Sequence, residues 1–419
     1  MTGDVRRIGL SLGADLCWPQ FYTDILAELG PIDVGGTAVD IEVERITIEP
    51  FDLAQEVKYD VVLDRLTPWY TTSREWIKKA VVMNGTYTLN SPFTLQAMQK
   101  HTSYAAMMRL GVPVPETWLL PPKEYARTDP LEDDLDVTLE RYAQMFDLRA
   151  LGDQIGYPLY MKPYDGGAWV GVTKISDGDA LEAAYDISGS RLMHLQKAVD
   201  PFDLFVRCLA VGPQVNVIRY NPDAPLHDRY EVDFEFVDAA QHTHLTDLTL
   251  LINTFFGWDF NSCEALRSKG SFYPIDFANA NPDSQVTSLH FYMPWLVKAL
   301  IRWSVFCAVT QRRMRFDLGW SDYTDIADSI ADYDERIAAF GGLARNRLDA
   351  AEFEAFSESA FADLDEVALD YFAGDRCRGI VRHKVETLFP ADEVDRFTDH
   401  FFGLIEFWQT TERDRMAAS

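Results

Sequence analysis

Cysteine is scarce in this sequence, and the few that occur are scattered, odd in number and without a C-x-x-C pair: Cys17, Cys208, Cys263, Cys307 and Cys377. An odd set without paired spacing argues against a disulfide framework and against a zinc site. The pattern favours reduced, mostly buried thiols, and we therefore expect a cytoplasmic protein.

Basic residues are also few, because 38 Lys and Arg stand against 66 Asp and Glu, for a formal net charge of −28. Binding to nucleic acid needs a basic face, and so does binding to an anionic membrane surface. The charge argues against both partners. Any anionic substrate must meet locally placed Lys and Arg side chains.

Long apolar runs and leader signals are absent as well. The most membrane-like segment, residues 291–309, carries Lys298 and Arg302 in mid-run, which predicts a buried amphipathic helix and not a span. The start of the chain, MTGDVRRIGLSLGADL, has too short an apolar run for a signal peptide. No G-x-G-x-x-G follows the first predicted strand, which disfavours a dinucleotide site there.

What is present is a large amount of core-forming material, since 47% of the 419 residues are hydrophobic and 13% aromatic. Such a chain has room for two or three domains and is not disordered over most of its length. Strands predicted at 7–13, 41–48, 59–65 and 87–90 alternate with helices at 21–29 and 74–83. This alternation predicts a parallel α/β sheet in a first domain, residues 1–93.

The middle of the chain, residues 94–317, reads as a second domain of α+β character. A helix N-capped near Ser91 comes first, and a helix at 148–155 precedes a central hairpin. Further strands are expected at 192–199, 205–211, 214–220, 230–236, 264–267 and 271–277, with helices at 245–256 and 294–315. Residues 318–419 are helical throughout, and we interpret them as an appendage or an oligomerisation surface, so that a homo-oligomer is possible.

The central hairpin spans residues 157–172, YPLYMKPYDGGAWVGV, in which a strand ends at Lys162 and a second β-prone run opens at Trp169. Paired glycines at Gly166 and Gly167 let backbone N–H groups approach an anion without interference from Cβ. The lysine adds a point charge that suits a phosphate. An ordinary glycine-rich hairpin with an exposed lysine is the alternative, and the motifs on either side decide between them.

Those motifs follow a specific order. Lys100 in a helix precedes the segment GVPVPET, and after the hairpin come LQKAV, Asp203 and finally the acids Glu264 and Asp276. In this order they resemble the ATP-grasp superfamily of ligases, among them glutamate-adding ligases, D-alanine–D-alanine ligases and glutathione synthetases. The resemblance is strongest over residues 90–283. It implies an ATP-grasp fold between the N-terminal parallel α/β domain and the α-helical C-terminal extension.

The resemblance also implies roles for the residues that match the family's motifs. Lys100 and Lys162 correspond to the two lysines that reach the nucleotide phosphates. The flexible loop that closes over the β- and γ-phosphates corresponds to Gly166, Gly167 and Ala168. We therefore expect ATP to bind beside the central hairpin.

The adenine edge is read in this family by a backbone hinge, which corresponds to Gln196, Lys197 and the residues up to Val199. Asp203 stands at the position of the ribose-binding acid. Arg229 resembles the loop arginine that contacts the terminal phosphate. These matches extend the expected nucleotide site from the hairpin to the following strands.

Magnesium ligands in the family correspond to Glu264, Asp276 and Asn279. Carboxylate and amide oxygens suit this hard cation, and the ions and basic groups neutralise charge as the γ-phosphoryl moves. In the family, an asparagine lies two residues after the second acid, but Ala278 stands at that position here. Asn279 and Asn281 are therefore alternative ligands. Ser262 stands where the D-alanine ligases carry an arginine for the substrate carboxylate.

The activity that the resemblance implies is ATP-dependent joining of a small-molecule carboxylate to an amine through an acylphosphate. A kinase, a C–S ligase, a non-catalytic nucleotide-binding regulator and a structural or interaction protein built on the helical tail remain alternatives. Arg207 either points into the phosphate cleft as a catalytic group or forms a structural salt bridge. Trp69 and Tyr70 follow a strand end of the first domain, where they line an acceptor site or pack in the core.

Overall fold

The computed structural model describes residues 4–94, 99–125, 135–142, 144–167 and 169–418. The chain divides into two compact units. Unit 1 comprises Met1–Gln96, Phe205–Cys263 and Asn279–Ser419, and unit 2 comprises Ala97–Leu204 and Glu264–Ala278. The bounds of these units differ from the three predicted ranges, 1–93, 94–317 and 318–419. The division into three domains stays a prediction.

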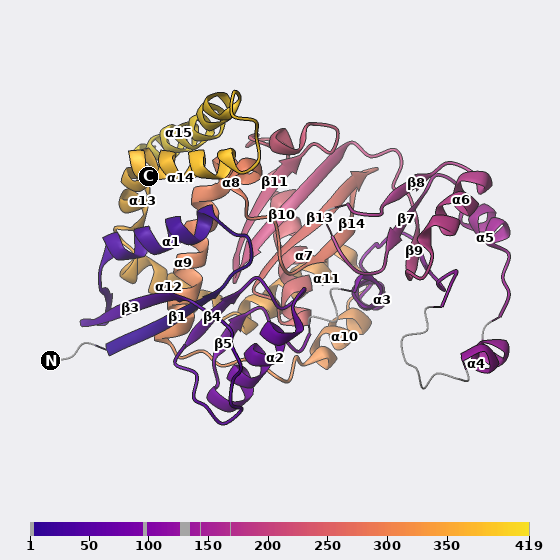
Figure 1. Cartoon of the computed structure of the whole chain (residues 1–419), viewed down its shortest axis with the longest axis horizontal. Coiled ribbons are helices and arrows are strands. Elements are labelled where there is room, and N and C mark those ends of the chain that lie inside the picture. The colour runs from indigo at the N-terminus through magenta and orange to yellow at the C-terminus, as the bar shows by residue number, and fades with distance from the viewer. Residues whose placement is uncertain (1–3, 95–98, 126–134, 143, 168, 419) are drawn as a thin grey trace. The chain divides into compact units, whose positions relative to one another are not determined.

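The first sheet of unit 1 has five strands in the order β2-β3-β1-β4-β5. Figure 1 labels four of them, β3, β1, β4 and β5. Strands β1 (Asp4–Ser11), β3 (Thr37–Arg45), β4 (Val61–Asp64) and β5 (Tyr87–Leu89) are parallel. Helices α1 (Cys17–Leu29) and α2 (Thr71–Lys79) connect strands, and α2 continues into a π-helical turn, η1 (Ala80–Asn84). The predicted parallel α/β sheet is confirmed.

The sequence did not predict one strand of this sheet, β2. Strand β2 (Ile32–Val34) pairs antiparallel with β3 through a turn at Gly35 and Gly36, whose φ angles are 59° and 86°. Three residues are too few to show an alternating pattern, and only the paired glycines indicate the turn.

The second sheet has the order β12-β11-β10-β13-β14. It contains β10 (Leu204–Val211), β11 (Gln214–Tyr220), β12 (Tyr230–Glu231), β13 (Phe260–Ser268) and β14 (Ser271–Asn279). Within unit 1, β11 pairs antiparallel with both β10 and β12. The strand predicted to reach residue 236 ends at Glu231, and the short 3-10 turn η3 (Leu226–Asp228) precedes it.

Helices make up most of the rest of unit 1. They are α7 (Ala239–Phe256), α8 (Val286–Leu289), the 3-10 turn η4 (His290–Tyr292), α9 (Met293–Val309), α10 (Trp320–Ser329), α11 (Tyr333–Arg347), α12 (Ala350–Ala360), α13 (Leu364–Ala373), α14 (Asp375–Glu386) and α15 (Val394–Ala418). Among the described residues, Val286–Val309 is the segment whose length and apolarity would allow it to cross a membrane, and 83% of its most apolar stretch is buried inside the protein. The predicted buried helix is confirmed.

The C-terminal helices belong to unit 1 and share its core with the N-terminal helix α1. The ring of Phe372 in α13 lies 5.3 Å from Phe21 in α1, and the hydroxyl of Tyr371 donates to Asp24 at 2.6 Å. The predicted helical C-terminal region is confirmed, and its helices pack against α1 within unit 1. Helical periodicity shows which face is apolar but does not show which distant segment covers it. All five cysteines are free and buried, as predicted.

Unit 2 is built on a four-stranded antiparallel sheet in the order β6-β9-β7-β8. Its strands are β6 (Thr117–Leu120), β7 (Leu159–Pro163), β8 (Thr173–Ile175) and β9 (Met193–Lys197). Its helices are α3 (Lys100–Arg109), α4 (Leu135–Tyr142), α5 (Leu148–Ile155) and α6 (Gly178–Ser188). Leu159, Met161 and Leu195 belong to its apolar core.

Two boundaries in unit 2 differ from the prediction. The second strand of the central hairpin begins at Thr173 and not at Trp169, so a longer loop joins β7 to β8. Helix α3 begins at Lys100 after Gln99, and Ser91 is not its cap. Trp169 has a φ of 62°, which is incompatible with a strand. The helix predicted over 148–155 is confirmed, with Asp147 as its N-cap.

Candidate functional site

Lys162 lies near the end of β7, with its ammonium group buried. Its Nζ donates to Oε1 of Gln196 on β9 at 2.8 Å and to the carbonyl of Ile275 on β14 at 2.9 Å. The same Nζ lies 5.0 Å from the ring centre of Tyr104. Three different elements of unit 2 thus hold one cation, which is the arrangement that a buried charge requires.

Lys100 is the first residue of α3, and its side chain is 5% exposed. Its Nζ donates to the carbonyl of Gly166 at 2.7 Å and lies 3.4 Å from Oδ2 of Asp276. The backbone N–H of Lys100 donates to the carbonyl of Tyr164 at 2.8 Å. Helix α3 is therefore attached by both main chain and side chain to the loop that follows β7.

Two carboxylates of unit 2 accompany these lysines. Glu264 on β13 is buried, while the side chain of Asp276 on β14 is 23% exposed. Oδ1 of Asp276 is buried and has no hydrogen-bond partner among the described residues. We call Lys100, Lys162, Glu264 and Asp276 the charge cluster. Its unpartnered oxygen is available for a ligand, since a buried acceptor is costly to leave unpaired.

The electrostatics of the charge cluster are dominated by burial. Burial lowers the pKa of Lys162 from 10.5 to about 8, and the nearby Lys100 acts in the same direction. Asp276 and Glu264 act in the opposite direction and raise it. The ammonium form of Lys162 therefore prevails at neutral pH but is easily lost above it. The phenol of Tyr104 has a raised pKa because it is buried and faces Asp276 and Glu264.

His194 and Tyr104 lie beside the charge cluster, and the sequence did not predict either of them. His194 lies opposite Lys162 in the β7–β9 register, and burial together with Lys162, His101 and Lys100 lowers its pKa to about 3. Its ring stacks on His101 at 5.6 Å. The hydroxyl of Tyr104 donates to the carbonyl of Ile275 at 2.7 Å.

A signal for Tyr104 existed, because it follows Lys100 by four residues and so shares its helix face. His194 could be found only from the register of β7 and β9, which the sequence does not state.

The glycine loop, residues 164–172 between β7 and β8, carries Gly166 and Gly167. Gly166 has a φ of 92°, in the region that favours glycine. A Cβ added at either glycine would meet no heavy atom within 4 Å in the described structure. The backbone here is open to an approaching anion. Ala168, the third predicted loop residue, lies outside the described residues.

The predicted hinge and ribose positions also lie in unit 2. Gln196 is held between Lys162 and Oγ1 of Thr117, to which its Nε2 donates at 2.7 Å. Nζ of Lys197 donates to the carbonyl of Gly156, and Val199 follows β9.

Asp203 is exposed and forms an ion pair with Arg267 at 2.8 Å, which lowers the pKa of the Asp203 carboxyl. Gln196 contacts the charge cluster directly through Lys162, whereas Asp203 is paired with Arg267.

Arg207 and Arg229 belong to unit 1. Nη1 of Arg207 on β10 donates to the hydroxyl of Tyr230 at 2.7 Å, and its guanidinium lies over the rings of Tyr220 and Tyr230. Nε of Arg229, just before β12, donates to the carbonyl of Ala224 at 3.0 Å. These contacts define where both side chains are anchored, and their catalytic roles stay predictions.

The alternative amide ligands, Asn279 and Asn281, also lie in unit 1. Nδ2 of Asn279 donates to the carbonyl of Ser262 at 3.3 Å, and Nδ2 of Asn281 donates to the carbonyl of Arg65 at 3.2 Å. Side chains alternate between the faces of a strand. Asn279 and Asp276, separated by an odd number of positions on β14, would lie on opposite faces in regular strand geometry. In the part of the chain that the structure describes, no group of three or more His, Cys, Asp or Glu residues could hold a metal.

Comparison with known proteins gives distant similarities. No family model matches the chain, and no curated protein matches it. The chain is similar to a RimK domain ATP-grasp protein from Sphaerobacter thermophilus, with 16% identity, a TM-score of 0.48, and coverage of 70% of this chain and 97% of that one.

It is also similar to D-alanine–D-alanine ligase from Bacillus anthracis in complex with ATP, with 15% identity, a TM-score of 0.44, and coverage of 82% and 99%. The chain is also similar to the VanG D-Ala:D-Ser ligase from Enterococcus faecalis, with 14% identity and a TM-score of 0.44. That match covers 71% of this chain and 95% of the other. Likeness of this degree does not by itself establish what the chain does.

Proposed function

We propose that this protein is an ATP-dependent carboxylate–amine ligase of the ATP-grasp fold. The observation that carries the proposal is the charge cluster, in which two buried lysines face two carboxylates beside an open glycine loop. Buried cations next to a turn whose N–H groups are accessible suit a polyphosphate. The order of motifs along the sequence also supports an ATP-binding ligase.

In this proposal Lys100 and Lys162 bind the phosphates, and the N–H groups of Gly166 and Gly167 close over them. The hinge of Gln196, Lys197 and Val199 reads the adenine. Asp203 binds the ribose by exchanging its contact with Arg267 for a hydroxyl. Arg207 and Arg229 then contribute charge toward the terminal phosphate.

The residues present fit a magnesium ion. Mg²⁺ is commonly held by one or two carboxylates, with phosphate oxygens and water completing its octahedron. Glu264 and Asp276 would hold it, and Oδ1 of Asp276 is a buried oxygen without a partner in the described chain. The amide ligand stays a prediction from the sequence, with Asn279 and Asn281 as its alternatives. When bound, the ion neutralises the charge of the phosphates.

The chemistry follows from positioning. The γ-phosphoryl group passes from ATP to the carboxylate substrate, leaving ADP and an acylphosphate. The amine then attacks the acyl carbon, the C–N bond forms, and inorganic phosphate leaves. Lys100 and Lys162 stabilise the charge that develops on the phosphoryl oxygens, and the buried site excludes water from the acylphosphate. The buried free cysteines support a reducing, cytoplasmic setting.

A screen of carboxylates paired with amines, read as ADP and phosphate release, tests the proposal. Phosphate release that requires both substrates supports a ligase. ADP formation with a stable phosphorylated product points instead to a kinase, and release that requires a thiol in place of the amine points to a C–S ligase. Nucleotide binding without turnover under any pairing identifies a non-catalytic regulator.

A further inference from the structure

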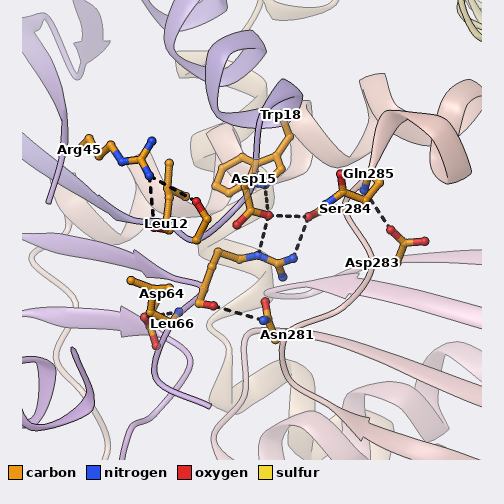
Figure 2. A network of polar contacts seen from close by, with 12 residues as sticks. Leu12, Asp15, Trp18, Arg45, Asp64, Leu66, Asn281, Asp283, Ser284 and Gln285 are labelled. Atoms are coloured by element: carbon orange, nitrogen blue, oxygen red, sulfur yellow. Dashed lines mark hydrogen bonds and ion pairs between the residues drawn. The ribbon is translucent and has the colours of Figure 1, made fainter. Parts of the chain in front are cut away.

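Arginines of unit 1 that stabilise the fold are held by acceptors of the chain itself. In the network of Figure 2, Oδ1 of Asp15 accepts a hydrogen bond from Nε of Arg65 at 3.2 Å, and the hydroxyl of Ser284 accepts one from Nη2 at 2.8 Å. Nη2 of Arg45 donates there to two backbone carbonyls. An arginine that lines a cavity without such acceptors is therefore a candidate for binding a ligand.

A cavity of about 350 Å³ lies wholly within unit 1. Its walls come from β5, the residues after α7, the loop that follows α9, and the junction between α11 and α12. Cavities of this size hold small molecules. Among the described residues that line it are four arginines, in a chain that has only 38 Lys and Arg against 66 Asp and Glu: Arg312, Arg313, Arg315 and Arg347.

Two of these arginines hold the wall of the cavity together. Nε of Arg312 donates to the hydroxyl of Tyr87 at 3.3 Å and its Nη2 to the carbonyl of Arg347 at 2.8 Å, while its Nη1 pairs with Asp349. Nη2 of Arg347 pairs with Asp322 at 2.8 Å. Both guanidinium groups are thus used by the fold.

The other two arginines are exposed and largely unused. Nη1 of Arg313 donates to the carbonyls of Asn84 at 3.2 Å and Gly85 at 3.0 Å, and its remaining nitrogens have no hydrogen-bond partner among the described residues. Within the same described part of the chain, Arg315 forms neither a hydrogen bond nor an ion pair. Their free N–H groups can bind an oxyanion.

The acids that line the cavity leave this positive charge largely uncompensated. Oδ2 of Asp259 is buried and accepts from the indole N–H of Trp303 at 3.0 Å, and burial raises the pKa of this carboxyl. Asp349 is already paired with Arg312. Glu352 is exposed and has no ion-pair partner in the described chain, so it alone opposes the two unused arginines.

The cavity also has an apolar wall, to which Met314, Leu318 and Leu348 contribute. A phosphate monoester carries a charge of about −1.5 to −2 at pH 7, which two guanidinium groups can neutralise. A phosphate with an apolar body therefore matches both parts of the lining.

We propose that this cavity is a second anion site, which binds a small phosphate monoester with an apolar body through Arg313 and Arg315. The charge cluster lies in unit 2, so this site is distinct from the proposed ATP site and does not depend on the ligase. Binding requires neither nucleotide nor metal. Because the ligand binds the folded cavity only, it should also raise the unfolding temperature of the protein.

Isothermal titration calorimetry of the full chain without nucleotide tests the inference with phenyl phosphate, inorganic phosphate and phenol. We expect phenyl phosphate to bind, inorganic phosphate to bind about tenfold more weakly because it lacks the ring, and phenol not to bind measurably. Arg315→Gln should weaken binding of both phosphates about tenfold. Glu352→Gln removes the opposing charge and should strengthen it about twofold to fivefold.

Arg396→Gln, at an exposed arginine of α15 in the same unit, is the matched control and should bind as the unaltered protein does. Leu318→Ala should weaken binding of phenyl phosphate but not of inorganic phosphate. The control for the apolar contact is Trp69→Ala, which should change neither. Trp69 and Tyr70 are each 60% exposed, so the alternative that they pack in the core is wrong.

The inference would be overturned if phenyl phosphate did not bind, if phenol bound equally well, or if Arg315→Gln and Arg396→Gln lost the same affinity. Loss of phenyl phosphate binding in Lys162→Ala, with unchanged binding in Arg315→Gln, would place the phosphate at the charge cluster and would equally contradict it. ATP affinity, measured separately, tests the ligase and not this cavity.

Discussion

Lys162 is the residue whose chemistry is most sensitive to its surroundings. Burial lowers its pKa to about 8, so the free protein loses this proton as the pH rises through that value, whereas the unfolded chain retains it until about 10.5. Because the unfolded chain binds more protons in this window, the free energy of unfolding should increase with pH there. In the proposed site the protonated form of Lys162 binds phosphate, so ATP affinity should fall above pH 8.

Two variants of Lys162 separate charge from packing. Lys162→Ala should weaken ATP binding by roughly one to two orders of magnitude, which corresponds to the loss of one charged hydrogen bond. The affinity of this variant for ATP should no longer fall above pH 8. Lys162→Arg keeps its positive charge above pH 8, so its affinity for ATP should not fall there. Isothermal titration calorimetry below and above pH 8 measures both. Unchanged affinity in Lys162→Ala would remove this residue from the site.

Asp276 should act in turnover more than in binding. Asp276→Asn keeps the shape of a side chain that lies 3.4 Å from Lys100 but removes the charge that would hold magnesium. We expect ATP affinity to change little and ADP release to be abolished, because metal positioning fails before adenine recognition does. Asp186→Asn, an exposed acid of unit 2 paired with Lys123, is the control.

Normal turnover by Asp276→Asn would place the metal ligands elsewhere. In the same assay, Asn279→Ala and Asn281→Ala should differ sharply in the magnesium concentration that they require. If neither variant alters that requirement, the amide ligand has been wrongly assigned.

Among the elements, the glycine loop between β7 and β8 is the one that must change on binding. Glycines rearrange at little cost, and they leave N–H groups free to meet phosphate. Amides of residues 165–167 should exchange hydrogens quickly in the free protein and slowly with magnesium and a non-hydrolysable ATP analogue. Equal protection in both states, measured by hydrogen-exchange mass spectrometry, would support a purely structural hairpin.

Substitutions in this loop distinguish strain from blocked access. Gly167→Val enters open space without a positive φ, so it should fold normally and lose turnover because a β-branched side chain blocks the phosphate. Gly166→Val adds backbone strain, since φ is 92°. Gly36→Val, at a φ of 86° in the β2–β3 turn of unit 1, is its matched control and should lose stability without losing ATP affinity.

At the scale of the whole molecule, N-terminal and C-terminal segments stabilise one another inside unit 1. Phe372 of α13 is fully buried, 5.3 Å from the ring of Phe21 in α1 and 5.6 Å from that of Trp408 in α15. Phe372→Ala should lower the free energy of unfolding by about 3–5 kcal/mol, as cavity-forming substitutions in cores do.

Urea denaturation, followed by circular dichroism, measures that loss. Leu388→Ala, at an exposed position after α14, should change the unfolding free energy by less than about 0.5 kcal/mol. A separate, early transition of the C-terminal helices in Phe372→Ala would contradict the shared core.

Local patterns in the sequence were sufficient wherever one segment's own periodicity carried the information. The parallel strands of the first sheet, helix α5 (Leu148–Ile155) and strand β11 (Gln214–Tyr220) follow from alternation, caps and turn residues. The order of motifs along the chain also singled out the two lysines and two acids that lie together in the charge cluster. Each of these features depends on residues that are neighbours in sequence or on their order.

Tertiary structure alone decided what lies around those residues. His194 reaches Lys162 through the β7–β9 register, Arg65 contacts Asp15 and Ser284, and the C-terminal helices cover α1. The physical reason is that periodicity reports only which face of an element is apolar. Register and packing partner depend on side chains tens to hundreds of positions apart, whose contacts form only in the folded chain.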